Sequence, residues 1–287
     1  DHVYSNPISG SPQTVGKLSV EDLKNFYKAN YAPQGSALSV VGDFKSADMK
    51  MRLKNLFAVW KKNVSSQKNQ AGIAVTPPQS SRVLLVNKDD ARETTFLIGG
   101  LGIRRDNPDF VAIEVVNTVF GGRFTSWLND ELRVNSGLTY GASSRFNPLK
   151  NSGTFAISTF TATKSTEAAI DKALEVLDSL HKKGIDEKTL SSAKNYVKGQ
   201  FPPRYETAGQ LAGLLTQMFW YGFDESYINN FQSNVDGLTA AKAKEIINKY
   251  FPKDKLQFVL IGKSEDIKKI AAKYGTVTEK QIKADGF

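Results

Sequence analysis

The sequence predicts an α+β fold, in which helices cover a mainly antiparallel sheet. Segments with the alternating or β-branched pattern of strands occur in pairs, and groups of amphipathic helices separate these pairs. One helix–strand unit also occurs twice, which indicates a duplicated architecture. A hydrophobic content of 40%, with ordinary amounts of Gly and Pro, is typical of a folded chain with a buried core.

The repeated unit is an amphipathic helix behind a Ser or Thr cap, followed by a proline and a short apolar strand that ends at glycine. Its copies, residues 18–42 and 238–262, run 24 positions from the opening Leu to the closing Gly and lie 220 positions apart. In the first copy, Leu23, Phe26 and Tyr27 are expected to face inward. Because only 17 residues precede that copy, we expect a truncated copy of a unit followed by a complete one.

This repeat predicts three parts in the chain. Residues 1–60 are expected to be the C-terminal tail of a first unit, and residues 82–287 a complete second unit. Between them, residues 61–81 are polar, lack hydrophobic periodicity and contain Pro77-Pro78, so we expect a linker there.

The elements of the second unit follow from the spacing of apolar residues and from capping and breaking residues. Strands are expected at residues 82–86, 94–98, 138–146, 154–161 and 258–261. Helices are expected near residues 107–120, 125–136, 165–183, 186–197, 207–218 and 238–250. Asp89-Asp90 is interpreted as a hairpin turn, and Gly137 suits the left-handed position after a helix.

Composition excludes several classes of function. The net charge is +9, but the lysines are spread along the chain among acidic residues, and no nucleic-acid-binding motif is found. No apolar stretch approaches the roughly 20 residues of a membrane helix. We therefore expect neither a nucleic-acid nor a membrane partner, and a basic nucleic-acid-binding module is the poorest alternative. The lack of cysteine is compatible with a bacterial periplasm but leaves the compartment open.

The two histidines are poor candidates for metal ligands. His2 and His181 lie far apart in the sequence, and zinc needs three protein ligands at workable spacing. We expect His181 to be exposed at a helix C-terminus. No metal site is therefore predicted in this chain.

Arg133 and Tyr140 are the most informative polar pair. Arg133 falls in the last turn of a predicted helix, and Tyr140 lies early in the strand beyond the Gly137 turn, so one corner could bring the two side chains together. A guanidinium and a phenol suit a peptide carbonyl or a developing oxyanion. The alternative is structural, with Arg133 at the negative end of the helix dipole and Tyr140 half-buried in packing.

The run GGRFTSWLNDELRVNSGLTYGASS, which begins at Gly121, resembles the signature of the second half of the pitrilysin or insulinase-like zinc metallopeptidases, a family that includes mitochondrial processing peptidase. The paired glycines, the Leu-Arg pair and the Gly-Leu-x-Tyr sequence that ends at Tyr140 carry the resemblance. The repeated helix–Pro–strand–Gly unit is similar to the closing segment of each half in that family.

The resemblance implies two similar halves arranged around a peptide chamber. The first half carries an inverted zinc motif, H-x-x-E-H, in which the metal activates water. The second half holds the substrate, a peptide or unfolded polypeptide. Carried over to this chain, Tyr140 would donate to the scissile carbonyl or oxyanion as a catalytic residue. Arg133 would bind the substrate backbone or orient the phenol.

This chain departs from the family pattern because it contains no H-x-x-E-H sequence. We therefore expect it to be inactive alone, with zinc supplied by a first half in the same polypeptide or by a partner subunit. The main alternative is a non-catalytic scaffold or partner subunit of the same family. The aromatic run Phe219-Trp220-Tyr221 is expected to be core packing at a helix end, with the lining of a peptide chamber as the alternative. Pro202-Pro203 is expected to be a turn.

Overall fold

The computed structural model describes residues 8–60 and 75–283. The chain divides into two compact units. One unit joins the N-terminal residues up to Ala74 with Pro202–Asp224, and the other contains Val75–Phe201 and Glu225–Phe287. Most of the predicted linker and His2 lie outside the described residues.

The first unit is helical. Its elements are α1 (Pro12–Val15), α2 (Val20–Asn30), α3 (Ser46–Leu56), a 3₁₀ turn (Pro202–Tyr205) and α8 (Ala208–Tyr221). Ser19 and Thr207 begin α2 and α8 in capping boxes, in which the cap side chain and the side chain three residues later bond each other's backbone N–H. The helix starts expected from these caps are therefore correct.

Two predictions for the first unit are wrong. Leu23, Phe26 and Tyr27 were expected to face inward, but they are exposed, and no residue of α2 or α3 is buried. Phe219 and Trp220 were expected to pack in a core, yet both side chains are more than half exposed. Amphipathic spacing identifies the apolar face of a helix, but it does not supply the surface that covers that face.

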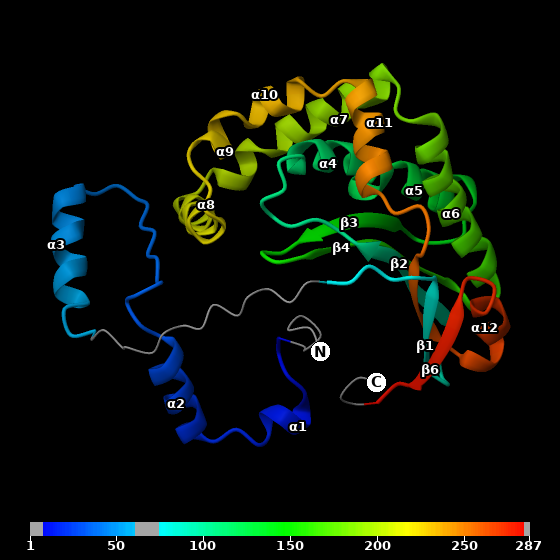
Figure 1. Ribbon diagram of the computed structural model, residues 1–287, viewed down its shortest axis with the longest axis horizontal. Helices are drawn as coiled ribbons and strands as arrows, with labels where there is room; N and C mark the ends of the chain where they lie inside the picture. The colour runs from blue at the N-terminus through cyan, green and yellow to red at the C-terminus, as the bar shows by residue number, and fades with distance from the viewer. Residues whose placement is uncertain (1–7, 61–74, 284–287) are drawn as a thin grey trace. The chain divides into compact units, whose positions relative to one another are not determined.

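The second unit is a sheet covered by helices (Figure 1). Its strands are β1 (Arg82–Asn87), β2 (Glu93–Leu101), β3 (Ala142–Pro148), β4 (Gly153–Ala162), β5 (Gln257–Gly262) and β6 (Thr276–Gln281). Its α-helices are α4 (Phe110–Asn117), α5 (Trp127–Asn129), α6 (Thr166–Lys183), α7 (Glu187–Gln200), α9 (Ser226–Asn229), α10 (Phe231–Asp236), α11 (Ala240–Tyr250) and α12 (Ser264–Ala271). The α+β class is confirmed.

The strands of the described residues form one sheet in the order β3-β4-β2-β5-β1-β6. Pairs β3–β4, β2–β4 and β2–β5 are antiparallel, whereas β1 pairs in parallel with β5 and β6. The predicted hairpin at Asp89-Asp90 is wrong, because β5 lies between β1 and β2. The two aspartates form a turn, and Asp90 instead pairs with Lys88 at 2.5 Å. Strand β6 and helix α12 were not predicted.

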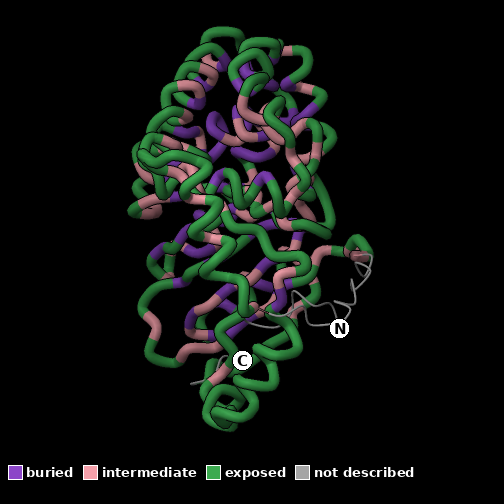
Figure 2. Tube along the Cα trace, turned by 90° about the vertical axis from the view of Figure 1, so that its left-hand side faces the viewer, coloured by how far each residue is buried: buried purple, intermediate pink, exposed green. Residues whose placement is uncertain are grey.

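The core lies between the helices and one face of the sheet. Alternate residues of β4 are buried, including Phe155, Ile157 and Thr159, whereas the intervening side chains are exposed or half-buried. Figure 2 marks the buried positions in purple along the chain. Phe120 and Phe251 meet edge to face with centroids 5.8 Å apart, so the segment after α4 and the segment after α11 share this core.

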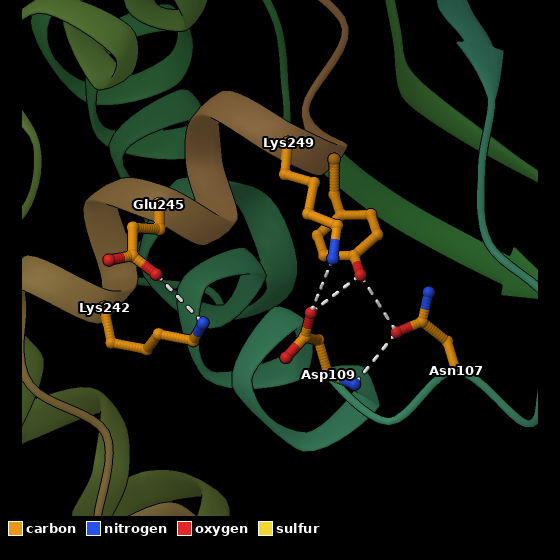
Figure 3. A network of polar contacts seen from close by, with 6 residues as sticks. Asn107, Asp109, Lys242, Glu245 and Lys249 are labelled. Carbon is orange, nitrogen blue, oxygen red and sulfur yellow. Dashed lines mark hydrogen bonds and ion pairs between the residues drawn. The ribbon is translucent and has the colours of Figure 1, made fainter.

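A polar network fixes the start of α4 to the end of α11 (Figure 3). The Tyr250 hydroxyl lies 2.7 Å from Asp109 Oδ2 and 3.2 Å from Asn107 Oδ1. Lys249 approaches the same Asp109 oxygen at 3.3 Å. The hydrogen bond from Tyr250, followed by the one from Lys249, keeps the pKa of Asp109 below its usual range.

Candidate functional site

The candidate site lies on the corner between α5 and β3. Helix α5 continues into a π-helical segment, Asp130–Asn135, which carries Arg133. Gly137 then takes a φ of +61°, and its N–H donates to the Arg133 carbonyl at 3.2 Å. The left-handed turn predicted at Gly137 is thus correct. A π-helical segment is rare in proteins and is often found at functional sites.

Arg133 and Tyr140 come together at this corner. The guanidinium carbon of Arg133 lies 4.9 Å from the centre of the Tyr140 ring and 4.6 Å from the centre of the Phe124 ring. These distances are typical of cation–π contacts. The Tyr140 side chain is 76% exposed and that of Phe124 is 69% exposed, so both rings face solvent. Tyr140 is therefore not a packing residue, which was the structural alternative.

Buried threonines of β4 hold the backbone on both sides of Tyr140. Thr159 Oγ1 lies 2.8 Å from the Gly141 carbonyl oxygen and 2.8 Å from Thr139 Oγ1. The Thr161 hydroxyl donates to the Leu138 carbonyl at 2.6 Å. Because both threonines are almost fully buried, water does not compete for these hydrogen bonds. An exposed phenol is thus carried on a fixed backbone.

Asn129 links the backbone at Phe124 to the first residue of β3. Its Nδ2 donates to the Phe124 carbonyl at 2.6 Å, and its Oδ1 accepts from the Ala142 N–H at 3.2 Å. The side chain is 3% exposed. Asn129 therefore positions both aromatic residues that contact Arg133. Sequence analysis did not identify it, although a polar Asn within a helix was an available signal.

The outer edge of β3 is covered by the segment after α4. Asn117 Nδ2 donates to the Ser144 carbonyl at 3.0 Å, and the Ser144 hydroxyl bonds Asn117 Oδ1 at 2.6 Å. Gly121 allows this approach, because a Cβ at that position would lie 2.5 Å from the Ser144 nitrogen. This close approach explains why glycine occupies position 121, the first of the paired glycines. The covering also leaves fewer free backbone groups at this edge for another strand.

His181 is buried, and the prediction that it is exposed is wrong. It lies in the last turn of α6 and is 7% exposed, and its Nε2 has no hydrogen-bond partner within the described residues. Burial lowers the pKa of His181, although a hydrogen bond with Asn248 opposes that shift. Within the described ranges, no group of three or more His, Cys, Asp or Glu side chains could hold a metal ion. The helices of the same ranges are too short or too polar to cross a membrane.

Comparison with known proteins identifies the family. Residues 17–197 match the family model described as the peptidase M16 inactive domain. The chain belongs to the M16 peptidase family. This agrees with the resemblance noted in the sequence, and the M16 family contains relatives with the names of zinc proteases.

Two curated M16 relatives, both from Helicobacter pylori, and one solved M16 structure illustrate the match. The zinc protease PqqE is 24% identical over 258 residues, which cover 87% of this chain and 56% of PqqE. The non-peptidase homolog YmxG is 20% identical over 260 residues, covering 90% of this chain and 59% of YmxG. The crystal structure of a peptidase M16 inactive domain from Pseudomonas fluorescens is 26% identical with a TM-score of 0.81, covering 91% of this chain and 61% of that one. This chain thus spans less than two thirds of the length of either curated relative.

Proposed function

We propose that this chain is the substrate-binding half of an M16 zinc metalloendopeptidase, with Arg133 and Tyr140 holding an extended polypeptide near the bond to be cut. One observation carries the proposal: Tyr140 is exposed and stacked against Arg133 on a backbone fixed by buried hydrogen bonds. Exposed aromatic side chains are normally mobile, so a fixed one is suited to binding.

The chemistry of the pair fits a peptide. The Tyr140 hydroxyl is a donor that can bond a carbonyl oxygen, and it bonds more strongly as that oxygen becomes negative in the transition state. The Arg133 guanidinium has five N–H donors, and its central carbon lies over the rings of Tyr140 and Phe124. These N–H groups are suited to bind substrate carbonyls. The described residues provide no zinc site, so this chain would contribute binding and orientation, and a zinc-bearing half would contribute the metal.

The proposal is tested in the complete peptidase, meaning this chain together with its zinc-bearing half. Tyr140→Phe is expected to lower kcat for peptide cleavage by roughly 10- to 1000-fold, as for other single transition-state donors. Folding should be unaffected, because the Tyr140 side chain is exposed.

Tyr196→Phe is the matched control. Tyr196 is also a partly exposed tyrosine near an arginine, since the Arg123 guanidinium carbon lies 5.9 Å from its ring centre. Its variant should cleave peptides at the normal rate. A normal kcat in Tyr140→Phe would show that Tyr140 is a surface residue without a role in catalysis.

A non-catalytic subunit of the same family is the second candidate. One observation favours it: the alignment with the Helicobacter pylori protein YmxG covers 90% of this chain, and YmxG is named a non-peptidase homolog. The two candidates differ in the zinc-bearing half. An intact H-x-x-E-H sequence in that half supports the peptidase, whereas a degraded motif supports the scaffold.

A further inference from the structure

The second unit contains a cavity that shares no lining residue with the corner carrying Arg133 and Tyr140. The cavity measures about 340 Å³ and lies between the second half of α6, the loop that joins α11 to β5, and the start of β5. All of its lining residues belong to the second unit. Small-molecule sites in proteins have volumes from roughly 300 Å³ upward, so a small ligand fits.

The walls of this cavity are largely apolar. Leu174 and Leu177 of α6 line it together with Leu256 and Phe258. Tyr274 also lines it, and its ring stacks on that of Phe258 with the centroids 5.4 Å apart. Aliphatic and aromatic walls of this kind suit the apolar part of a ligand.

His181 adds a polar atom without a partner. Its side chain lines the cavity and is buried, and no described residue forms a hydrogen bond with its Nε2. A buried polar atom that is left unpaired is costly, so a ligand group that bonds it would be stabilising. The charged groups that act on the imidazole are the ammonium groups of Lys244 and Lys253. A negatively charged ligand group is therefore favoured beside His181.

The charged side chains that line the cavity differ in their partners. Asp178 is already paired with Lys182 at 2.5 Å. In contrast, Lys253 and Asp254 have no ion-pair partner among the described residues. One ammonium group and one carboxylate are thus available to a ligand, next to apolar walls.

We propose that this cavity binds a free α-amino acid with an apolar side chain. The carboxylate of the ligand bonds to His181 and Lys253, and its ammonium group pairs with Asp254. Its side chain packs against the leucines and Phe258. A residue inside a polypeptide carries neither charge, so the site selects the free amino acid. This site goes beyond the proposed function, because it uses none of the residues assigned there.

Calorimetric titration of the full chain with L-phenylalanine tests the proposal. We expect saturable binding with a Kd of roughly a few millimolar or tighter. Phenylalaninamide lacks the carboxylate and is expected to bind at least about 10-fold more weakly. The analogue 3-phenylpropionate lacks the ammonium group and should also bind more weakly. No saturable binding of L-phenylalanine up to about 10 mM, or equal or tighter binding of either analogue, overturns the proposal.

Two lysine variants locate the ligand. Lys253→Gln removes the cation of the cavity and is expected to weaken L-phenylalanine binding at least about 10-fold. Lys255→Gln is the matched control, because it removes the same charge from the same loop and Lys255 does not line the cavity. Its Kd should stay within about 2-fold of the wild type. Both lysines are exposed, so both variants should fold. Unchanged affinity in Lys253→Gln would place the ligand elsewhere.

Nuclear magnetic resonance of the histidine side chains provides a second test. The imidazole signal of His181, identified by its absence in His181→Gln, should move when L-phenylalanine is added, because the ligand carboxylate bonds Nε2. A His181 signal that stays in place while L-phenylalanine binds would contradict the proposed contact. Either result leaves the test of Tyr140 unaffected, because that test measures peptide cleavage.

Discussion

Arg133, Tyr140 and Phe124 lie on a corner whose backbone is held by buried side chains. Asn129 accepts from the first N–H of β3 and donates to the carbonyl of Phe124. It acts as a positioning residue, because its own side chain is buried and only its neighbours reach solvent. At the scale of single residues, the site therefore depends on a buried amide as well as on an exposed phenol.

Asn129→Ala is expected to destabilise the fold by ~1–3 kcal/mol, since it leaves the Ala142 N–H and the Phe124 carbonyl without their partner. Urea denaturation measures the loss. Asn135→Ala provides the comparison, because Asn135 is exposed and its amide bonds only the surface Glu131 among the described residues. Equal midpoints for the two variants would show that the Asn129 hydrogen bonds contribute nothing to stability.

At the scale of elements, the corner depends on how closely α4 and its π-helical continuation, Thr118–Gly122, approach β3. Their backbones touch at Gly121, and Asn117 bonds both the backbone and the hydroxyl of Ser144. This contact fixes β3, which begins two residues after Tyr140. The paired glycines of the sequence are thus explained at one position by steric contact.

Gly121→Ala is expected to lower the free energy of unfolding by ~1–3 kcal/mol or more, because its Cβ would overlap the Ser144 backbone. Gly199→Ala in α7 is the matched control. A Cβ there meets nothing within 4 Å, so alanine should stabilise the helix by ~0.5–1 kcal/mol. Thermal melts of the two variants should therefore shift in opposite directions. A Gly121→Ala protein as stable as the wild type would contradict the close approach.

At the scale of the whole molecule, we expect His181 to make stability depend on pH. It is surrounded by Asn248, the Phe251 backbone and the ammonium groups of Lys244 and Lys253. Burial is the largest cause of its lowered pKa, and the two lysines lower it further. The folded protein therefore binds a proton at His181 less readily than the unfolded chain does.

The direction of the pH dependence follows from the difference between the folded and unfolded pKa of His181. The unfolded histidine titrates near its ordinary pKa of 6.5, and the folded one titrates below it. The stabilisation is present above pH 6.5 and is lost as pH falls through that value towards the folded pKa. We expect the free energy of unfolding to decrease between pH 7 and pH 5.5, and this slope to be reduced in His181→Gln. Equal slopes in the wild type and His181→Gln would contradict the assignment.

The sequence by itself determined the local features of this protein. Caps at Ser19, Asp186, Thr207 and Thr239 set the starts of helices, and Gly137 takes the left-handed turn that its position indicated. The repeat and the Arg-Tyr segment were also visible, and the family they indicated is correct. These features depend on residues a few positions apart, so their spacing is enough to predict them.

Only the tertiary structure decided what lies beside what. In the folded protein, β5 lies between β1 and β2, and the Arg133 guanidinium lies over the Tyr140 ring. His181 and Asn129 are buried, whereas the apolar face of α2 is exposed. The physical reason is that hydrophobic burial has no direction, so a pattern specifies an apolar face but not the surface that covers it. The two copies of one helix–strand unit, one buried and one exposed, demonstrate this difference within a single chain.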